Sequence, residues 1–466
     1  MNRWAFRNSV FFLVFIAIFF SSYAMIRAER FGGLSSLIGF GCLHDSVCFG
    51  SLNSHVLPKG AAIFPTGGYD GQFYYYVAAG LYGHQDILDL SSALREEPGP
   101  GRIFVDSLGF RLPRIGFPLL SGWLFLFGAR ALALGMPLLL LLSHLLSSWF
   151  LFRMRPSAGW LYGLNPVSLL SYGLNLAEPL AMSLAVSASI ALIRPAGLPG
   201  SMRNAFRWWS SILALLLALI SKETMFVVGF ALGWFFLLFA WKRTVAMANR
   251  IKQVMGPTGA VHSAGAEGQK DRTGAVAGLY AMASYWALPV WILISGLLAL
   301  LWYYHAGFFS GESAAGKMQL PFTGLLDFLQ SGNGLSGGRG LLALGIFWMA
   351  FLSLYFVLHS ILPMRTDVFS RSDRDRKKRA AGIGRRTGTT LLERRLVFPG
   401  LALNLLLISF ASAEEYWLTF ANIVRLFAPA FLLMSFLRQR WLFRVSAGWT
   451  ILISFLLWWN DFRHLM

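Results

Sequence analysis

The chain has 466 residues, of which 56% are apolar and only 13% are charged, and its mean hydropathy is +0.57. One soluble core cannot bury so much apolar surface, so the composition excludes an ordinary soluble protein and predicts a polytopic membrane protein. The net charge of +19 comes from basic residues gathered between apolar runs. This pattern is typical of cytoplasmic loops and does not indicate a nucleic-acid-binding protein.

The first seven residues include two arginines, Arg3 and Arg7, and an apolar run follows from about residue 9 to residue 25. This run is long enough to cross a bilayer, and the basic residues before it predict an N-terminus in the cytoplasm. A cleaved signal peptide is the alternative, because the small residues near Ala24 are compatible with a processing site.

Residues 26–115 form the longest interval without a spanning segment, and they hold seven basic against eight acidic residues. This balance predicts an external loop, which we expect to carry short helices at the membrane face rather than a separate domain. The only two cysteines, Cys42 and Cys48, lie in this loop. A small disulfide ring is expected in an oxidising compartment, and two free thiols are the alternative.

Apolar runs recur through the rest of the chain. The short stretch 160–172 is interrupted by Asn165 and Pro166 and is predicted to be re-entrant or a short helix. Longer spans are expected near 115–129, 131–152, 173–193, 205–220, 224–241, 277–303, 341–363, 397–413, 421–437 and 445–460. The sequence therefore predicts an all-α membrane protein with about 11–12 transmembrane helices.

The loops between these spans differ in charge. Basic residues and linker-like composition place 242–275 in the cytoplasm, and the charge run of 364–396 is placed there too. The glycine-rich interval 304–340 is predicted to be external. The whole chain, 1–466, is thus predicted to be one polytopic membrane domain.

The stretch 64–78 is polar and aromatic inside an otherwise apolar protein. Two glycines allow a tight turn before Asp70, which is expected to cap a short helix that begins at Gly71. The helix would present the Asp70 carboxylate beside an aromatic platform. Two roles stay open from the residues alone: a helix cap in a loop anchored by tyrosines, or a catalytic carboxylate.

The run Gly-Tyr-Asp-Gly-Gln-Phe-Tyr-Tyr-Tyr at 68–76, followed by Arg-Leu-Pro-Arg-Ile-Gly-Phe-Pro at 111–118, resembles a pattern in bacterial integral-membrane glycosyltransferases of the C superfamily. Weaker similarity to the same superfamily occurs at 164–166, 176–179, 221–224 and 422–429. Enzymes of this superfamily take a sugar from a polyprenyl-phosphate carrier, and their catalytic carboxylate lies in the first external loop.

The resemblance implies that Asp70 is the catalytic carboxylate. It also implies a multi-pass protein of the bacterial cytoplasmic membrane that serves the cell envelope. Its partners would be a polyprenyl-phosphate-linked sugar, an unidentified acceptor and the lipid bilayer.

Charged residues from distant parts of the chain are predicted to meet at the outer membrane face. Sugar transfer needs a carboxylate that takes the acceptor's proton and cations that hold the departing phosphate. Asp70 is the expected general base of an inverting displacement. The expected substrate-binding residues are Tyr69, Gln72, Tyr75, Arg111, Arg114, Glu178, Lys222 and Arg425.

Each charged residue of this set has an alternative role. Arg111 and Arg114 flank the entry of a span, where they would hold phosphate or bind lipid headgroups. Arg425 lies in an apolar span and needs a partner, for which Glu414, Glu415 or the phosphate are expected.

Glu178 has the alternative role of capping the helix that it begins, because an acid is favourable at a helix N-terminus. The adjacent charges of Lys222 and Glu223 could satisfy each other.

No cofactor is expected, since the sequence shows no tight cluster of histidines or carboxylates, although a divalent metal stays open as an alternative. The leading hypothesis is therefore a glycosyltransferase that acts at the outer face of the cytoplasmic membrane. The alternative is a transporter or flippase of lipid-linked sugars, in which charges would follow a whole pathway rather than gather at one face.

Overall fold

The structure, a computed structural model, describes residues 3–44, 47–65, 68–91, 99–193, 202–255, 286–307, 320–321, 323–330, 348, 393–411, 420–437 and 440–462. Helices dominate these residues. Except for Trp348, the predicted span 341–363 lies outside them, and so does the predicted loop 364–396 up to residue 392.

The first half of the chain starts with one long helix and continues with short elements. These are α1 (Arg3–Phe31), η1 (Leu34–Leu37), β1 (Cys42–His44), β2 (Val47–Cys48), α2 (Phe49–Leu52), η2 (Ser54–Val56), α3 (Gly71–Gly83), β3 (Asp86–Asp89), β4 (Arg102–Val105), α4 (Leu108–Arg111), η4 (Leu112–Arg114), α5 (Gly116–Ser121) and η5 (Gly122–Phe127). Strands β1 and β2 pair antiparallel, and β3 and β4 pair parallel.

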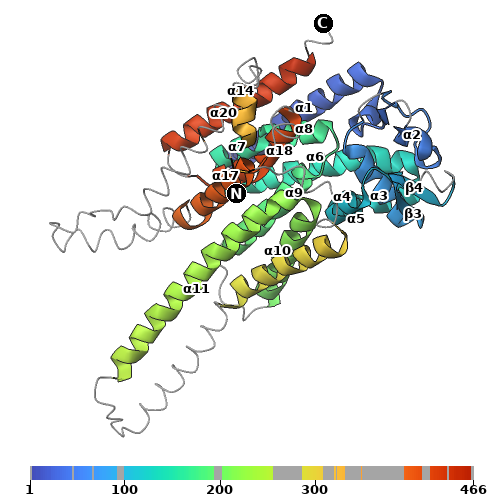
Figure 1. Cartoon of the computed structure of the whole chain (residues 1–466). Helices are drawn as coiled ribbons and strands as arrows, with labels where there is room; N and C mark the ends of the chain where they lie inside the picture. The colour runs from blue at the N-terminus through green and yellow to red at the C-terminus, as the bar shows by residue number, and fades with distance from the viewer. Residues whose placement is uncertain are drawn as a thin grey trace.

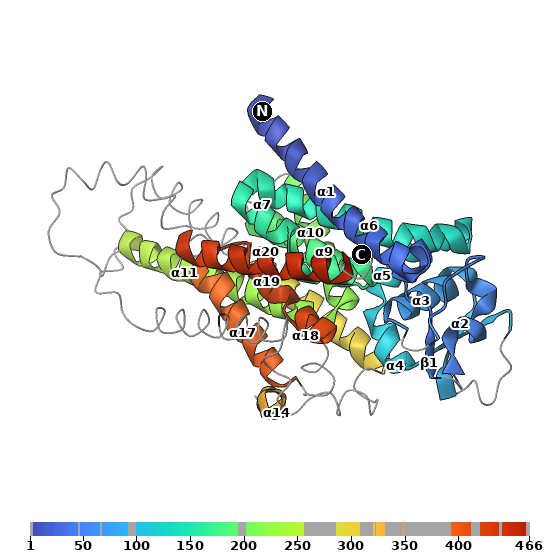
Figure 2. The same cartoon turned by 90° about the horizontal axis from the view of Figure 1, so that it is seen from above.

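The rest of the chain is helical where it is described. Its elements are α6 (Ala129–Met154), α7 (Pro156–Gly163), α8 (Pro166–Gly173), α9 (Glu178–Ile193), α10 (Met202–Ser221), η6 (Glu223–Met225), α11 (Phe226–Met255), the helix Trp286–His305, α14 (Thr323–Gln330), η7 (Glu393–Val397), α17 (Phe398–Ser409), α18 (Phe420–Leu426), α19 (Ala428–Met434) and α20 (Arg440–Phe462). The elements α2, α3, α4, β3 and β4 gather at one end of the molecule, and the C-terminal end of α11 lies at the opposite end (Figure 1, Figure 2).

Four helices among the described residues are long and apolar enough to cross a membrane: Arg7–Phe31, Ala129–Met154, Glu223–Asn249 and Trp286–His305. Several of their large apolar side chains are exposed, including Phe11 at 67% and Leu293 at 72%. Such broad apolar surfaces are unfavourable in water and suit a lipid environment. The chain is therefore an α-helical membrane protein with little sheet.

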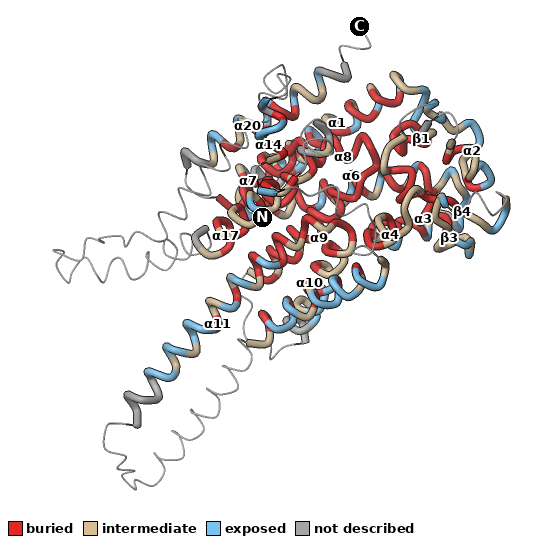
Figure 3. The backbone as a smooth tube through the Cα atoms, in the orientation of Figure 1, coloured by how far each residue is buried: buried red, intermediate tan, exposed pale blue. Residues whose placement is uncertain are grey.

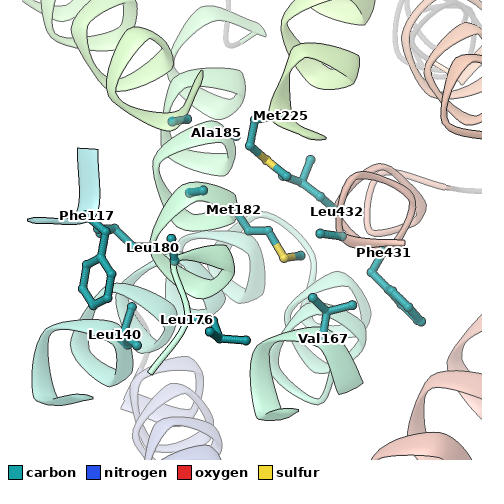
Figure 4. Packing of buried hydrophobic residues seen from close by; sticks show 14 of the residues in the cluster. Phe117, Leu140, Val167, Leu176, Leu180, Met182, Ala185, Met225, Phe431 and Leu432 are labelled. Carbon is teal, nitrogen blue, oxygen red and sulfur yellow. The ribbon is translucent and has the colours of Figure 1, made fainter. Parts of the chain in front are cut away.

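Helix α9 forms the centre of the buried core. Its sequence is apolar on every face, which is typical of a helix surrounded by protein. Figure 4 shows Leu180 of α9 near Phe117 and Leu140, and Met182 between Val167 and Leu432. Figure 3 shows that burial is highest around α9 and falls along α11 towards its C-terminal end.

Several helix ends differ from the predicted spans. The helix predicted to end near 241 continues to Met255. The span predicted at 173–193 starts only at Glu178, because the chain turns through Asn175 in the left-handed region, with φ 50°.

Two of the predicted apolar segments are each divided into two helices. The stretch 160–172 is divided between α7 and α8, and Asn165 caps α8 by accepting a hydrogen bond from the Ser168 amide. The span predicted at 421–437 is two helices, because Phe427 separates α18 from α19 and Pro429 lies in the first turn of α19.

The short helices expected in the first loop are present, but α3 does not lie on a surface. Its residues from Gly71 to Gly80 are all buried. The apolar and aromatic side chains of α3 cover its whole circumference, so the helix packs inside the protein against neighbours such as α5 and η5.

The predicted disulfide between Cys42 and Cys48 is present and links the two strands of the β1–β2 hairpin. Replacing both cysteines with serine is expected to lower the free energy of unfolding by about 2 kcal/mol, because the ring restricts the unfolded chain. Mass spectrometry of non-reduced peptides is expected to recover the two cysteines in one linked species. Recovery of both as alkylatable thiols from unreduced protein would contradict the pairing.

Candidate functional site

Asp70 lies immediately before α3, at the N-cap position, with φ −54° and ψ −24°. Its side chain makes no capping hydrogen bond, so the capping interpretation is wrong. Each carboxylate oxygen instead faces a guanidinium: Oδ1 lies 3.0 Å from Nη1 of Arg111, and Oδ2 accepts a hydrogen bond of 3.0 Å from Nη1 of Arg425. Two ion pairs therefore replace the local cap.

Gly71 allows Asp70 to approach these partners. A Cβ atom at this position would overlap the carbonyl oxygens of Leu174 and Ile38. The start of α3 is thus pressed against the turn that leads into α9 and Glu178. Only glycine permits this approach of two backbone segments.

Arg425 connects this region to the buried core. Its Nε donates a hydrogen bond of 2.6 Å to Oε1 of Glu178, whose side chain has no solvent exposure. The Lys222 ammonium lies 3.3 Å from the same Glu178 oxygen and 3.3 Å from Glu223. The expected pairing of Lys222 with Glu223 is therefore present, but Lys222 also neutralises Glu178.

The two arginines of the first loop each hold an acid with two hydrogen bonds. Arg111 binds Asp106 at 2.7 and 2.5 Å. Arg114 binds Glu223 at 2.9 and 2.8 Å. This paired geometry is the strong form of a guanidinium–carboxylate contact.

These contacts form one ionic network of four acids and four bases in alternation. In order of contact its members are Asp106, Arg111, Asp70, Arg425, Glu178, Lys222, Glu223 and Arg114. The formal charges of the eight groups cancel. A buried network of ions is tolerable only when its charges are paired in this way.

Solvent reaches the ionic network through its carboxylates. The side chains of Asp70, Asp106 and Glu223 are 27–29% exposed, whereas the four basic side chains are at most 10% exposed. An entering ligand therefore meets the acids first. An anion that reaches the guanidiniums therefore competes with the carboxylates already paired to them.

The electrostatics fix Asp70 in its ionised form. Burial would raise the pKa of Asp70, but the guanidiniums of Arg111 and Arg425 outweigh this effect and hold the pKa well below its ordinary value. Burial would lower the pKa of Arg111, whereas the Asp70 and Asp106 carboxylates raise it. The Asp70–Arg111 ion pair therefore persists at neutral pH.

Several buried polar atoms near the ionic network make no hydrogen bond within the described part of the chain. Among them are the Tyr74 hydroxyl, Oδ1 of Asn175, Oε2 of Glu178, the Thr224 hydroxyl and Nη1 of Arg111, which forms only an ion pair with Asp70. Burial raises the pKa of Tyr74, so its hydroxyl keeps its proton. Unused hydrogen-bonding capacity of this kind in a buried site is expected to be met by water or by a ligand.

The structure brings Arg111, Arg114, Glu178, Lys222 and Arg425 together with Asp70, but it places the three other predicted binding residues differently. Gln72 accepts a hydrogen bond of 3.0 Å from the Gly41 amide. The Tyr75 hydroxyl donates to the Val56 carbonyl at 2.8 Å. The Tyr69 ring lies 5.8 Å from the Arg27 guanidinium. Gln72 and Tyr69 therefore hold the segment around Asp70, and Tyr75 holds the middle of α3 against η2.

Tyr74, Asp106, Asn175 and Thr224 belong to the site but were not predicted as site residues from the sequence. Tyr74 lies four residues after Asp70, so helical periodicity places it on the same face, and this spacing could have identified it. Asp106 carries no comparable signal. Glu414 and Glu415, the expected partners of Arg425, lie outside the described residues. Among the residues that are described, no group of three or more histidine, cysteine or acidic side chains could hold a metal ion.

Arg425→Gln is expected to lower the free energy of unfolding by about 3 kcal/mol, because fully buried Glu178 then keeps Lys222 as its one charged partner among the residues that the structure describes. The double variant Glu178→Gln/Arg425→Gln is expected to lose less than the sum of the two single losses. Thermal unfolding of purified protein in detergent measures both. Arg130→Gln, at an exposed position, serves as the control and is expected to change little.

If the double variant loses as much free energy of unfolding as the two single variants added together, Arg425 and Glu178 do not stabilise each other, which would contradict the ion pair.

The chain was compared with protein-family models, with curated proteins and with solved structures, and none of them matches. The resemblance carried by residues 68–76 and 111–118 thus stays an expectation. What the protein does has to be inferred from the ionic network and its surroundings.

Proposed function

We propose that the protein is a glycosyltransferase that moves a sugar from a polyprenyl-phosphate carrier to an acceptor at the outer face of the bacterial cytoplasmic membrane. One observation carries the proposal. The partly exposed Asp70 carboxylate is held between arginines from two distant segments, and Arg425 lies 355 residues from it. A base beside several cations is the arrangement that this transfer needs.

Asp70 is the general base of the reaction. A carboxylate offers about four lone-pair positions, so an acceptor hydroxyl can bind while both arginines stay in place. Asp70 takes the hydroxyl proton as the acceptor oxygen forms a bond to the anomeric carbon. The bond from that carbon to the phosphate oxygen breaks, polyprenyl phosphate leaves with the electron pair, and the anomeric centre is inverted.

The guanidiniums of Arg111 and Arg425 hold the phosphate of the donor. Because they are occupied by carboxylates, the phosphate binds by exchange and takes over part of their hydrogen bonds. Weakening these pairs raises the pKa of Asp70 towards its ordinary value of about 3.9 and makes it a stronger base. Donor binding and activation of the base are therefore coupled.

The unpaired polar atoms are suited to a sugar. Tyr74 and Thr224 supply hydroxyl groups, and Asn175 and Glu178 supply acceptor oxygens; three of them lie on elements that carry the ionic network, and Asn175 lies in the turn before α9, beside Gly71. A sugar presents several hydroxyl groups that both donate and accept. These atoms are the proposed contacts to the transferred sugar.

The arrangement of the chain supports an outer-face site. The short elements α2, α3, α4, β3 and β4 lie at one end of the molecule, and α11, whose C-terminal part belongs to the basic segment 242–275, extends to the other (Figure 1). With about 11–12 passes, the segment 26–115, into which α1 extends as far as Phe31, and the segment 304–340 are external, and the segment 242–275, into which α11 extends as far as Met255, and the segment 364–396 are cytoplasmic.

Asp70→Asn is expected to lower the rate of sugar transfer by roughly 10²–10⁴, because the amide cannot accept the proton. Each arginine keeps a second partner, Asp106 or Glu178, so the variant is expected to fold. Consumption of a panel of polyprenyl-phosphate hexoses and pentoses by purified protein in detergent measures the rate.

Asp106→Asn is the matched control, since Asp106 has similar exposure and also binds Arg111, and it is expected to lose much less activity. If folded Asp70→Asn protein transfers sugar at the wild-type rate, Asp70 is not the base. Movement of the intact lipid-linked sugar across a membrane without its consumption would favour the flippase alternative.

The pH dependence of transfer follows from the lowered pKa of Asp70. The base form is present above that pKa, so the rate is expected to show no loss due to Asp70 between about pH 8 and pH 5. Arg111→Gln removes the strongest opposing charge, which raises the pKa of Asp70 and shifts the acid limb to higher pH. Profiles of kcat/KM check this, and superimposable profiles would contradict it.

The ion pairs of Asp70 also make the stability of the fold depend on pH, again with a loss at low pH. A carboxyl group with a lowered folded pKa contributes stability above its unfolded pKa of about 3.9 and loses it as the pH falls through the folded value. The contribution of Asp70 to stability is therefore complete at neutral pH.

A further inference from the structure

A cavity of about 400 Å³ lies between the N-terminal part of α1 and the junction of α6 with α7. It is lined by Asn8, Ser9, Phe11, Phe152, Arg153, Pro156 and Trp160. Figure 2 shows this part of α1 beside α7. The cavity takes no part in the proposed transfer reaction.

Aromatic contacts fix the walls of the cavity. The ring of Phe12 stacks on Phe152 with centroids 4.4 Å apart and meets the edge of Trp160 at 4.9 Å. Ser9 is 3% exposed. The cavity thus combines an apolar, packed wall with polar groups and one arginine, which suits a ligand that is itself part apolar and part charged.

The cavity and the ionic network lie about one membrane thickness apart. Asn8 precedes Arg27, which contacts Tyr69 next to Asp70, by 19 residues on the same helix. At 1.5 Å per residue this is about 28 Å, close to the hydrocarbon thickness of a bilayer. If the ionic network is at one membrane interface, the cavity is at the other.

The charge around the cavity is positive. Arg7 and Arg153 are exposed at this end of α1 and α6. No acidic residue occurs before Glu29, and none occurs between Asp106 and Glu178, so the segments that form the cavity carry no negative side chain. An anion is therefore attracted here, and its charge is not opposed.

We propose that this cavity binds the headgroup of an anionic phospholipid from the cytoplasmic leaflet. A lipid fits better than a soluble anion, because the neighbouring surface is apolar and exposed. Val10, Phe11 and Leu146 are 43%, 67% and 51% exposed and offer contact to acyl chains. Arg153 binds the phosphate, and Trp160 lies at the level of the headgroups, where tryptophan is favoured.

Native mass spectrometry of the full chain in detergent, titrated with phosphatidylglycerol and with phosphatidylcholine of the same acyl chains, tests the proposal. Phosphatidylglycerol is expected to bind more tightly. Arg153→Gln is expected to weaken its binding about fivefold, the effect of one basic residue at a membrane surface. Asn8→Trp, which fills the cavity without changing charge, is expected to weaken it as well.

Arg130→Gln is the matched control. Arg130 is also exposed and lies on α6, about 35 Å from Arg153 at the other end of the helix. It is expected to leave binding of phosphatidylglycerol unchanged. Equal binding of the two lipids, or equal losses in Arg130→Gln and Arg153→Gln, would overturn the proposal. Competition by millimolar inorganic phosphate would identify a general anion site and would also overturn it.

Discussion

The ion pair between Glu178 and Arg425 is the constraint on which the arrangement of the site depends. Glu178 has no solvent exposure, and the Arg425 side chain is 10% exposed. An ion removed from water costs several kcal/mol unless close partners compensate it, so the loss of either residue leaves the other with too few partners and destabilises the protein. Because Arg425 also binds Asp70, the burial of this pair fixes the position of the most accessible carboxylate of the site.

The ionic network lies where apolar helices begin or end. Asp70 precedes α3, Glu178 begins α9, Lys222 separates α10 from η6, and Arg425 lies in the last turn of α18. Charges in the middle of a spanning helix would have to be buried in the hydrocarbon, whereas helix ends can bring them together at one level. The breaks in the apolar helices therefore place the polar groups of distant segments beside each other.

Much of this arrangement could be predicted from the sequence, and the missing part has a physical explanation. Composition identified a helical membrane protein, and loop charge brought Asp70, Glu178, Lys222 and Arg425 to one face. Local rules favoured a capping role for Asp70, but two tertiary ion pairs override it. The Tyr75 hydroxyl binds backbone carbonyls away from the ionic network, whereas Tyr74 lies near it, because one residue on a helix rotates the side chain by about 100°. The pairing of particular acids with particular bases depends on contacts between segments far apart in the chain, which no local pattern contains.

The balance of the ionic network bears on the choice between transfer and transport. Its eight groups gather at one place rather than along a path through the molecule, its bases are buried, and its acids meet the solvent. A phosphate that enters brings negative charge to a group of residues whose charges already cancel. It has to compete with the carboxylates for the arginines, and Asp70 is the carboxylate that two arginines share. In the proposed transfer reaction, a ligand that weakens the ion pairs of Asp70 would also raise its basicity, which would link binding to chemistry in a way that transport does not require.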